Sequence, residues 1–129
     1  MIEHQDRALQ VALEYYEAWA SKDLEQTMSF IADDVVCDAP AGRIEGARAY
    51  RGFLESFFQL LERAELIASF GDDETAMLLY DNETVPVPSA PSVGHFTVQD
   101  GKITRIRFIF DRVPYEAAAR TRQARSDSP

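Results

Sequence analysis

The chain of 129 residues lacks several features that indicate a particular chemistry. Its one cysteine, Cys37, cannot form a disulfide within the chain and lies in an apolar stretch, as a buried thiol does. Only two histidines occur, His4 and His95, and neither has a second metal ligand at suitable spacing. Neither a glycine-rich phosphate loop nor a GxSxG turn is present. We therefore expect no metal and no cofactor.

Positive charge and long apolar runs are also scarce. Thirteen Lys and Arg stand against 22 Asp and Glu, and the net charge of -9 would repel a phosphate backbone. No run approaches the ~20 apolar residues that a membrane helix needs. The N-terminal residues MIEHQDRALQ are acidic and polar where a secretory signal is basic and then apolar. We expect a cytoplasmic protein with neither a nucleic-acid nor a membrane partner.

The remaining composition is that of an ordinary globular domain, with 46% hydrophobic and 27% charged residues. The length suits one hydrophobic core. We expect a single domain over residues 1–113. We expect residues 114–129 to form a tail with a short helix, and residues 126–129 to be frayed.

Periodicity predicts three helices followed by strands. The first helix covers about residues 3–21. Asp23, with Gln26 three positions later, resembles a capping box that opens a second helix reaching Ile31. The remaining predicted elements are a strand at 35–37, an extended return at 43–46, a helix at 49–61, and strands at 66–70, 75–84, 94–99 and 102–111.

Turn residues separate the predicted strands. Asp100-Gly101 between alternating runs indicates a hairpin. Residues 86–91 contain three prolines, which remove ladder donors, so they should form a loop or an edge beside a pocket mouth. Helices followed by antiparallel strands indicate an α+β domain whose helices cover one face of a curved sheet.

Three stretches carry a resemblance to a known family: AWASKDLEQTMSFIADDVV, AGRIEGARAYRGFLESF and GHFTVQDGKITRIRFIFD. With the element order, they resemble the nuclear transport factor 2 (NTF2)-like superfamily, which includes ketosteroid isomerase and the SnoaL-type polyketide cyclases. The resemblance spans roughly residues 9–113. It implies a cone-shaped α+β barrel whose wide end opens into a cavity, and a homodimer formed through the outer face of the sheet.

The catalytic residues of these relatives match this chain only in part. The tyrosine that donates to the oxyanion in the isomerase falls on Tyr15. The gapless match to its catalytic base is Ala39, and Asp38, one residue earlier, lies on the opposite sheet face because strand side chains alternate. The second oxyanion donor falls on Gly94, and the aspartate of the cyclases falls on Phe108. Two of the three isomerase groups and the cyclase acid are therefore missing.

Other carboxylates could supply a base. If Met77 and Leu79 face the cavity, Asp81 and Glu83 continue the same row. An aspartate desolvated there would have its pKa raised toward the range useful in proton transfer. Asp81 is the preferred candidate, and the alternative is a solvated carboxylate at a strand end. Asp38 is a second candidate, or else a turn-capping residue or a residue of the cavity rim.

Further residues have both a binding and a structural interpretation. Tyr15 donates into the cavity or is satisfied by a neighbour. Asp111 ends a strand and pairs with Arg107 or Arg112. His95 points to the outer face, where it suits a dimer contact. The candidate ligand-binding residues are aromatic rings that could equally be plain core: Trp19, Phe30, Tyr50, Phe53, Phe57, Phe96 and Phe108.

Two functions from different classes follow. One is a cofactor-free isomerase, cyclase or hydrolase that acts on a small hydrophobic carbonyl or polyketide-like compound, with Asp81 or Asp38 as base and Tyr15 as donor. The other is a non-catalytic ligand-binding or dimeric interaction module. The position of Asp81 relative to Tyr15 and the cavity distinguishes them.

Overall fold

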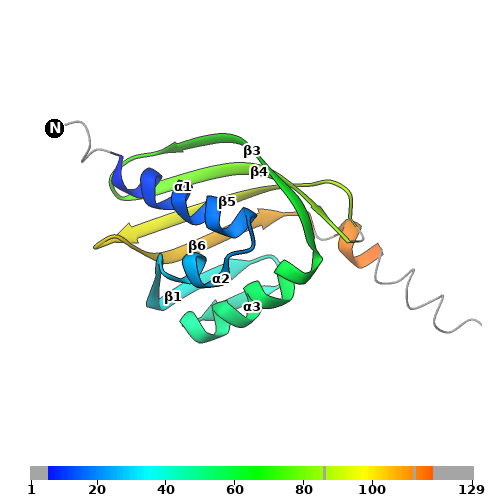
Figure 1. Ribbon diagram of the computed structural model, residues 1–129, viewed down its shortest axis with the longest axis horizontal. Helices are drawn as coiled ribbons and strands as arrows, with labels where there is room; N and C mark the ends of the chain where they lie inside the picture. The colour runs from blue at the N-terminus through cyan, green and yellow to red at the C-terminus, as the bar shows by residue number, and fades with distance from the viewer. Residues whose placement is uncertain (1–5, 86, 112, 118–129) are drawn as a thin grey trace, which may run out of the picture.

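The computed structural model describes residues 6–85, 87–111 and 113–117 (Figure 1). Within these residues, α1 to α3 and β1 to β6 follow one another in the order that the sequence predicts, before a helical segment at 113–117. Their bounds are α1 Arg7–Ala20, α2 Leu24–Met28, β1 Ile31–Ala39, β2 Gly42–Glu45, α3 Ala47–Leu60, β3 Leu61–Gly71, β4 Thr75–Thr84, β5 Ala90–Gln99 and β6 Lys102–Phe110.

The strands form one sheet in the order β2-β1-β6-β5-β4-β3. Only β1 and β6 are parallel, and every other neighbouring pair is antiparallel. The pairing of β1 with β6 places the first and last of these strands side by side, in the half of the sheet that ends at β2. The mixed, mostly antiparallel sheet with helices confirms the predicted α+β class.

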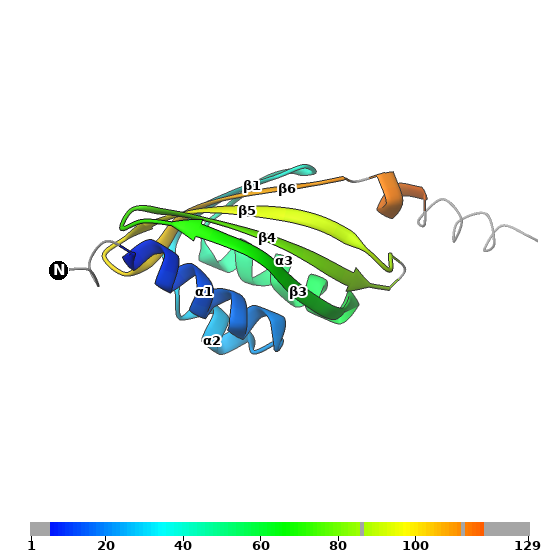
Figure 2. The same ribbon diagram turned by 90° about the horizontal axis from the view of Figure 1, so that it is seen from above.

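The helices lie on one side of the curved sheet (Figure 2). α1 packs on β3, β4 and β5, and α3 packs on β1 and β2. Helical spacing explains the buried stripe of α3, where Tyr50, Leu54 and Phe58 recur at every fourth position. The core therefore lies between the concave face of the sheet and these helices.

Loops hold the two ends of α1. At its start, the amide of Arg7 donates to the carboxylate of Asp73, and the amides of Ala8 and Leu9 donate to the carbonyl of Asp72. The turn between β3 and β4 thus satisfies amides that have no partner within the helix. At its end, Lys22 adopts a left-handed φ of 62°, which terminates the helix.

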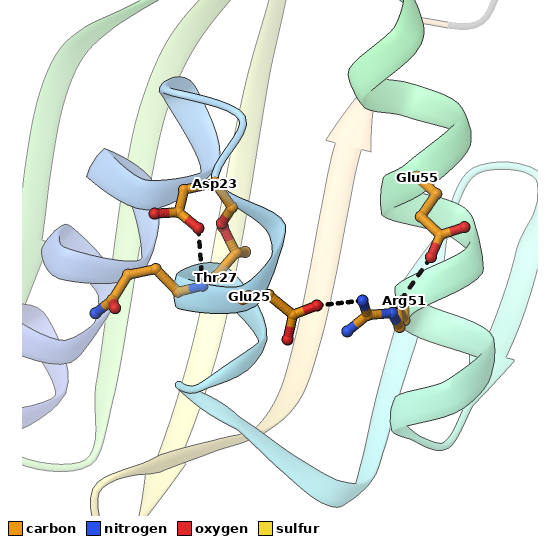
Figure 3. Close-up of polar contacts among 6 residues, drawn as sticks. Asp23, Glu25, Thr27, Arg51 and Glu55 are labelled. Atoms are coloured by element: carbon orange, nitrogen blue, oxygen red, sulfur yellow. Dashed lines mark hydrogen bonds and ion pairs between the residues drawn. The ribbon is translucent and has the colours of Figure 1, made fainter.

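Polar contacts fix α2 against α3 (Figure 3). The carboxylate of Asp23 accepts the amide of Gln26 at 3.1 Å, which confirms Asp23 as the predicted N-cap. Arg51 of α3 donates to Glu25 of α2 and, at 3.2 Å, to Glu55 one turn along its own helix. This chain of charges connects the two helices at the surface.

Several boundaries differ from the prediction. α2 ends at Met28 rather than reaching Ile31, because Ile31 already pairs with Ile103 of β6. β5 begins at Ala90 rather than at residue 94 and includes Pro91, which was predicted to lie in a loop or at an edge. The proline is tolerated there because β6 reaches only to Ser92, so Pro91 has a strand neighbour on one side alone.

The Asp100-Gly101 hairpin is confirmed between β5 and β6, with φ of 53° and 77° at its two central residues. Residues 113–117 are helical, in agreement with the predicted short helix. The tail positions 118–129, including the predicted frayed end, lie outside the described residues.

The side chains of β4 that face the core are the ones predicted to face outward, and the reverse also holds. Leu78 and Tyr80 are buried, whereas Met77 and Leu79 are 46% and 36% exposed. The prediction that Met77 and Leu79 face the interior is therefore wrong. It failed because both faces of this strand carry apolar side chains, so hydrophobicity alone does not identify the inner face.

Candidate functional site

One end of the domain contains a cavity of about 360 Å³ between the helices and the sheet. Residues from α1, α3, β4, β5, β6, the β1–β2 turn and the helical segment 113–117 form its wall. They are Trp19, Ala41, Phe53, Phe57, Leu60, Tyr80, Asn82, Ser92, Phe108, Phe110, Tyr115 and Glu116. Most of this wall is therefore aromatic or aliphatic.

Aromatic rings form a continuous stack that runs from the helical side of the cavity to the sheet. Trp19 stacks on Phe57 with ring centroids 5.3 Å apart, and Phe57 stacks on Phe53 at 6.4 Å. Phe53 in turn stacks on Phe108 of β6 at 6.3 Å. Phe53, Phe57 and Leu60 follow helical spacing along a stripe beside the fully buried one, so α3 presents one face to the core and another to the cavity.

The sheet side of the cavity carries polar groups. Tyr80 of β4 lies opposite Ser92 of β5, and Ser92 lies opposite Phe110 of β6. The three side chains therefore form one row across the inner face of the sheet. Asn82 follows on the same face of β4. The Ser92 hydroxyl donates to the carbonyl of Ala90 at 2.9 Å. Oδ1 of Asn82 is buried and has no hydrogen-bond partner among the residues that the structure describes.

The helical segment 113–117 lies at the mouth. The ring of Tyr115 meets Phe110 edge-on at 5.8 Å, and its hydroxyl lies near the side chain of Thr84. Glu116, also in this segment, is the one acidic residue among the described residues of the cavity wall. The chain that follows β6 therefore completes the site.

Burial keeps the tyrosines of the wall neutral. It raises the pKa of Tyr80 well above its usual value and also raises the pKa of Tyr115. Both hydroxyls stay protonated at neutral pH and can donate hydrogen bonds. Chemically, the wall can stack a flat ring and hydrogen-bond to one edge of it.

Tyr15 lies away from the cavity. Its hydroxyl is hydrogen-bonded to that of Tyr50, and both residues are at most 2% exposed. Burial raises the pKa of each. The structure thus corresponds to the alternative in which a neighbour satisfies the Tyr15 hydroxyl, and the predicted role of donor into the cavity finds no support in its position.

Asp81 lies on the outer side of β4, opposite the cavity wall. Its carboxylate accepts the amide of Ala90 at 2.8 Å and the hydroxyl of Ser89 at 2.9 Å. The next outer carboxylate, Glu83, lies 3.8 Å from Arg63. The prediction that Asp81 is a base desolvated in the cavity is therefore wrong. It assumed that Met77, Leu79 and Asp81 face the interior, whereas they face outward.

Asp38 forms part of an ionic cluster on the sheet, outside the set of cavity residues. Arg43 donates to its Oδ1 at 2.8 Å, while Arg105 and Arg107 lie 3.8 and 3.9 Å from Oδ2. The hydrogen bond from Arg43 holds the pKa of Asp38 below its usual value, so the carboxylate is a weak proton acceptor. Arg43 is the residue opposite Asp38 in the pairing of β1 with β2, so the carboxylate is held by a cross-strand ion pair.

Asp111 does not form the predicted ion pair with Arg107. Its carboxylate accepts the amide of Val113 at 2.9 Å, and Arg107 lies beside Asp38 instead. Arg112, the other predicted partner, is outside the described residues. Asp111 therefore shapes the link between β6 and the helical segment at the mouth.

Four of the seven predicted ligand-binding rings line the cavity: Trp19, Phe53, Phe57 and Phe108. The other three do not. Tyr50 is fully buried, and Phe96 packs between Tyr15 at 5.4 Å and Phe108 at 6.3 Å. Phe30 borders a separate surface groove between α1 and α2. Helical or strand spacing alone does not distinguish a core ring from a cavity ring.

The polar residues Tyr80, Asn82 and Ser92 were not predicted. The signal that could have found them is the inner row of β4 and β5, which becomes visible once Leu78 and Phe96 are assigned to the core. Phe110 and Tyr115 were also missed, because their part in the wall depends on how the chain returns to the cavity mouth.

Two positions at which the resemblance implies a catalytic aspartate, Gly94 and Phe108, carry no acid in this chain. At Gly94, an added Cβ would lie 2.7 Å from the ring of Phe96, so this glycine makes room for that ring. Phe108 occupies the cavity wall itself. Within residues 6–85, 87–111 and 113–117, no three His, Cys, Asp or Glu side chains form a group that could hold a metal ion. None of the helices described there is both long and apolar enough to cross a membrane.

The six-stranded curved sheet with helices on one face is the fold of NTF2-like proteins, several of which have solved structures that superpose on this chain. The chain belongs to the SnoaL-like domain family, which it matches over residues 12–106. None of the curated proteins matches it.

A structure from Kribbella flavida DSM 17836, described without an activity, is 49% identical, covers 92% of this chain and 98% of that one, and has a TM-score of 0.89. Protein SMa1630 of Sinorhizobium meliloti, provisionally assigned as a polyketide cyclase, is 20% identical over 78% of this chain and 94% of that one, with a TM-score of 0.71. A second Kribbella flavida protein, provisionally assigned as a ketosteroid isomerase, is 17% identical over 83% and 79%, with a TM-score of 0.74. The last two structures are similar to this chain in fold alone.

Proposed function

We propose that the protein binds a small, flat, largely apolar compound of the carbonyl or polyketide-like class in the cavity at the end of the domain. The stacked rings of Trp19, Phe57, Phe53 and Phe108 carry the proposal, because together they form one wall suited to a planar molecule. A volume of about 360 Å³ falls within the range of roughly 300–1,000 Å³ typical of small-molecule sites. The fold neighbours assigned to polyketides and steroids support the compound class.

Binding is favoured over turnover by the absence of acids at the family's catalytic positions. Ala39, Gly94 and Phe108 cannot transfer a proton. The two carboxylates that could have replaced them are engaged elsewhere, Asp38 with Arg43 and Asp81 with Ala90.

The single tryptophan provides a direct test, because Trp19 lies in the cavity wall. Titration with 9-fluorenone, a flat ketone, should quench Trp19 fluorescence saturably. Phe57→Leu removes one stacked ring and should weaken binding about 2- to 10-fold. The matched control is Phe70→Leu, since Phe70 is 72% exposed on β3, away from the cavity, and should bind as the wild type does. Equal weakening in both variants, or no saturable quenching, would refute the proposal.

A second candidate is a proton-transfer enzyme, favoured by one observation: Glu116 lines the same cavity as the neutral hydroxyl of Tyr80. Glu116 would act as base and Tyr80 would donate to the developing oxyanion. Deuterium incorporation next to the carbonyl of 1-tetralone, followed by NMR in heavy water, tests this. A rate of deuterium incorporation about 100-fold lower in Glu116→Gln, with the rate of the exposed control Glu62→Gln unchanged, would favour the enzyme.

We further propose that two copies associate through the outer face of the sheet. Met77 pairs in register with Phe70 on one side and His95 on the other, and Leu79 continues through Val93 to Ile109. Phe70, Met77 and Ile109 are 72%, 46% and 58% exposed. Such an apolar patch on adjacent strands is typical of an interface, and a two-fold axis would bury the patch of each copy on that of the other.

A further inference from the structure

The cavity wall contains a buried acceptor that no described residue satisfies. Asn82 is the one asparagine of the sequence and is 5% exposed. Its Oδ1 is buried without a hydrogen-bond partner among the described residues, and its side chain lines the cavity. Buried polar atoms in folded proteins nearly always have a partner, so an orphaned one in a cavity wall points to a ligand.

The neighbouring polar residue, Ser92, can also accept a hydrogen bond. Asn82 pairs in register with Ala90, and Tyr80 pairs with Ser92, so Asn82 and Ser92 are diagonal neighbours on the inner face. The Ser92 proton is already donated to the carbonyl of Ala90, which leaves the Ser92 oxygen as an acceptor. Two acceptors therefore lie together on the sheet side of the cavity.

Acceptors of this kind require a donor. A hydrocarbon would leave Oδ1 of Asn82 desolvated, as would an ether or an ester presented at that edge. An anion would place a negative charge next to two acceptors, and the described residues of the cavity wall include no basic side chain to compensate for it. A neutral hydroxyl or N–H group on the edge of a flat ring meets each of these conditions.

We propose that Asn82 is the residue that decides which flat molecules the cavity accepts, and that it does so by accepting a hydrogen bond from a ring hydroxyl of a neutral phenol or enol. Ser92 offers a second acceptor to the same group or to a neighbouring one. The inference rests on the proposed binding function and narrows its ligand from flat apolar compounds to those that carry a donor.

The alternative for Asn82 is a purely structural amide. In that case its replacement would lower the stability of the ligand-free protein and leave ligand preference unchanged. In the proposed role, Asn82→Leu introduces an apolar side chain of similar size and removes an acceptor that has no partner in the ligand-free protein. The ligand-free Asn82→Leu protein should then melt at the wild-type temperature or higher.

Three ring compounds of similar size provide the test: 2-naphthol donates a hydrogen bond, 2-methoxynaphthalene only accepts one, and naphthalene does neither. Isothermal titration calorimetry should show that the wild type binds 2-naphthol about tenfold or more tightly than either of the others. In Asn82→Leu the three affinities should lie within about threefold of one another. The matched control Gln59→Leu replaces an exposed amide on α3 and should retain the wild-type preference.

The outcomes separate the two proposals. If the wild type binds 9-fluorenone but binds 2-naphthol no better than naphthalene, this inference fails while the binding function stands. If the wild type binds none of these compounds, the binding function fails. Retention of the 2-naphthol preference in Asn82→Leu also refutes the inference. Asn82→Ala, which removes the same acceptor, replaces the leucine variant if that variant does not fold, and the same loss of preference is expected.

Discussion

At the scale of single residues, tight packing in the core decides what each position tolerates. Gly94 lies on the inner face of β5 between Leu78 and Phe108. An added Cβ there would meet Cζ of Phe96 at 2.7 Å, well inside contact distance. The glycine is therefore part of the core, although it contributes no side chain to it.

We expect Gly94→Ala to lower the free energy of unfolding by about 1–3 kcal/mol, because the Phe96 ring must shift in a packed core. Urea denaturation measures this. Gly52 lies in the interior of α3, where an added Cβ would have no neighbouring atom within 4 Å. Gly52→Ala should therefore stabilise the protein by about 0.5–1 kcal/mol through helix propensity. Equal effects of the two substitutions would contradict the steric explanation.

The buried pair of Tyr15 and Tyr50 yields a second prediction at this scale. Tyr15→Phe leaves the Tyr50 hydroxyl without its partner and should cost about 1–3 kcal/mol of stability. The double variant with Tyr50→Phe should recover part of that loss, because it removes both polar groups. Affinity for 9-fluorenone should not change in the single variant. A variant of normal stability that no longer binds would instead show that the Tyr15 hydroxyl acts in the cavity.

At the scale of elements, Asp81 of β4 holds the beginning of β5. Its carboxylate accepts the Ala90 amide and the Ser89 hydroxyl, which satisfies the first amide of the strand after the proline-rich connection. Asp81→Ala should cost about 1 kcal/mol in the free energy of unfolding and speed amide hydrogen exchange at Ala90. Glu83→Ala, which removes only the exposed contact with Arg63, should cost less than about 0.5 kcal/mol. Ligand affinity should be unaffected in both.

Strand β1 buries Cys37 completely, and this burial raises the pKa of its thiol to about 12. The thiolate is the reactive form, and at pH 8 it is nearly absent in the folded state. We expect no reaction with Ellman's reagent at pH 8 until the protein is unfolded in denaturant. Because Cys37 is the sole cysteine, the readout is unambiguous. Rapid labelling of the native protein would show that β1 opens readily or that the thiol is accessible.

At the scale of the whole molecule, the two faces of the sheet have different roles. The concave face forms the core and the cavity wall, and the outer face presents the apolar patch of Phe70, Met77, Leu79 and Ile109. If two copies meet there, the cavities remain open at the end of each domain. Association and ligand binding would then be independent.

We expect sedimentation equilibrium to show a dimer, and Met77→Glu to shift it toward the monomer, because a charge would be buried in the interface. Val85→Glu is the matched control, since Val85 is 51% exposed in the β4–β5 connection rather than on the sheet face. Both variants should retain the wild-type affinity for 9-fluorenone. A monomeric wild type would refute the interface.

Much of the fold was predictable because its signals are local. The α1 and α3 stripes, the Asp23 cap and the Asp100-Gly101 hairpin each depend on residues a few positions apart. The site was predictable only in part. Trp19, Phe53, Phe57 and Phe108 were identified as candidate rings, whereas Asn82 and Ser92 were missed and Asp81 was placed on the wrong face.

The sequence by itself determined the order of helices and strands, the turns between them and the set of apolar residues available for a core. Tertiary structure alone decided which face of β4 is inside, since Leu78 and Met77 are equally apolar and differ only in what packs against them. It also decided that Tyr15 meets Tyr50, 35 positions away, and that Tyr115 returns to the cavity mouth. The physical reason is that side-chain periodicity is a property of one element, whereas the inner face and the cavity arise only from the packing of several.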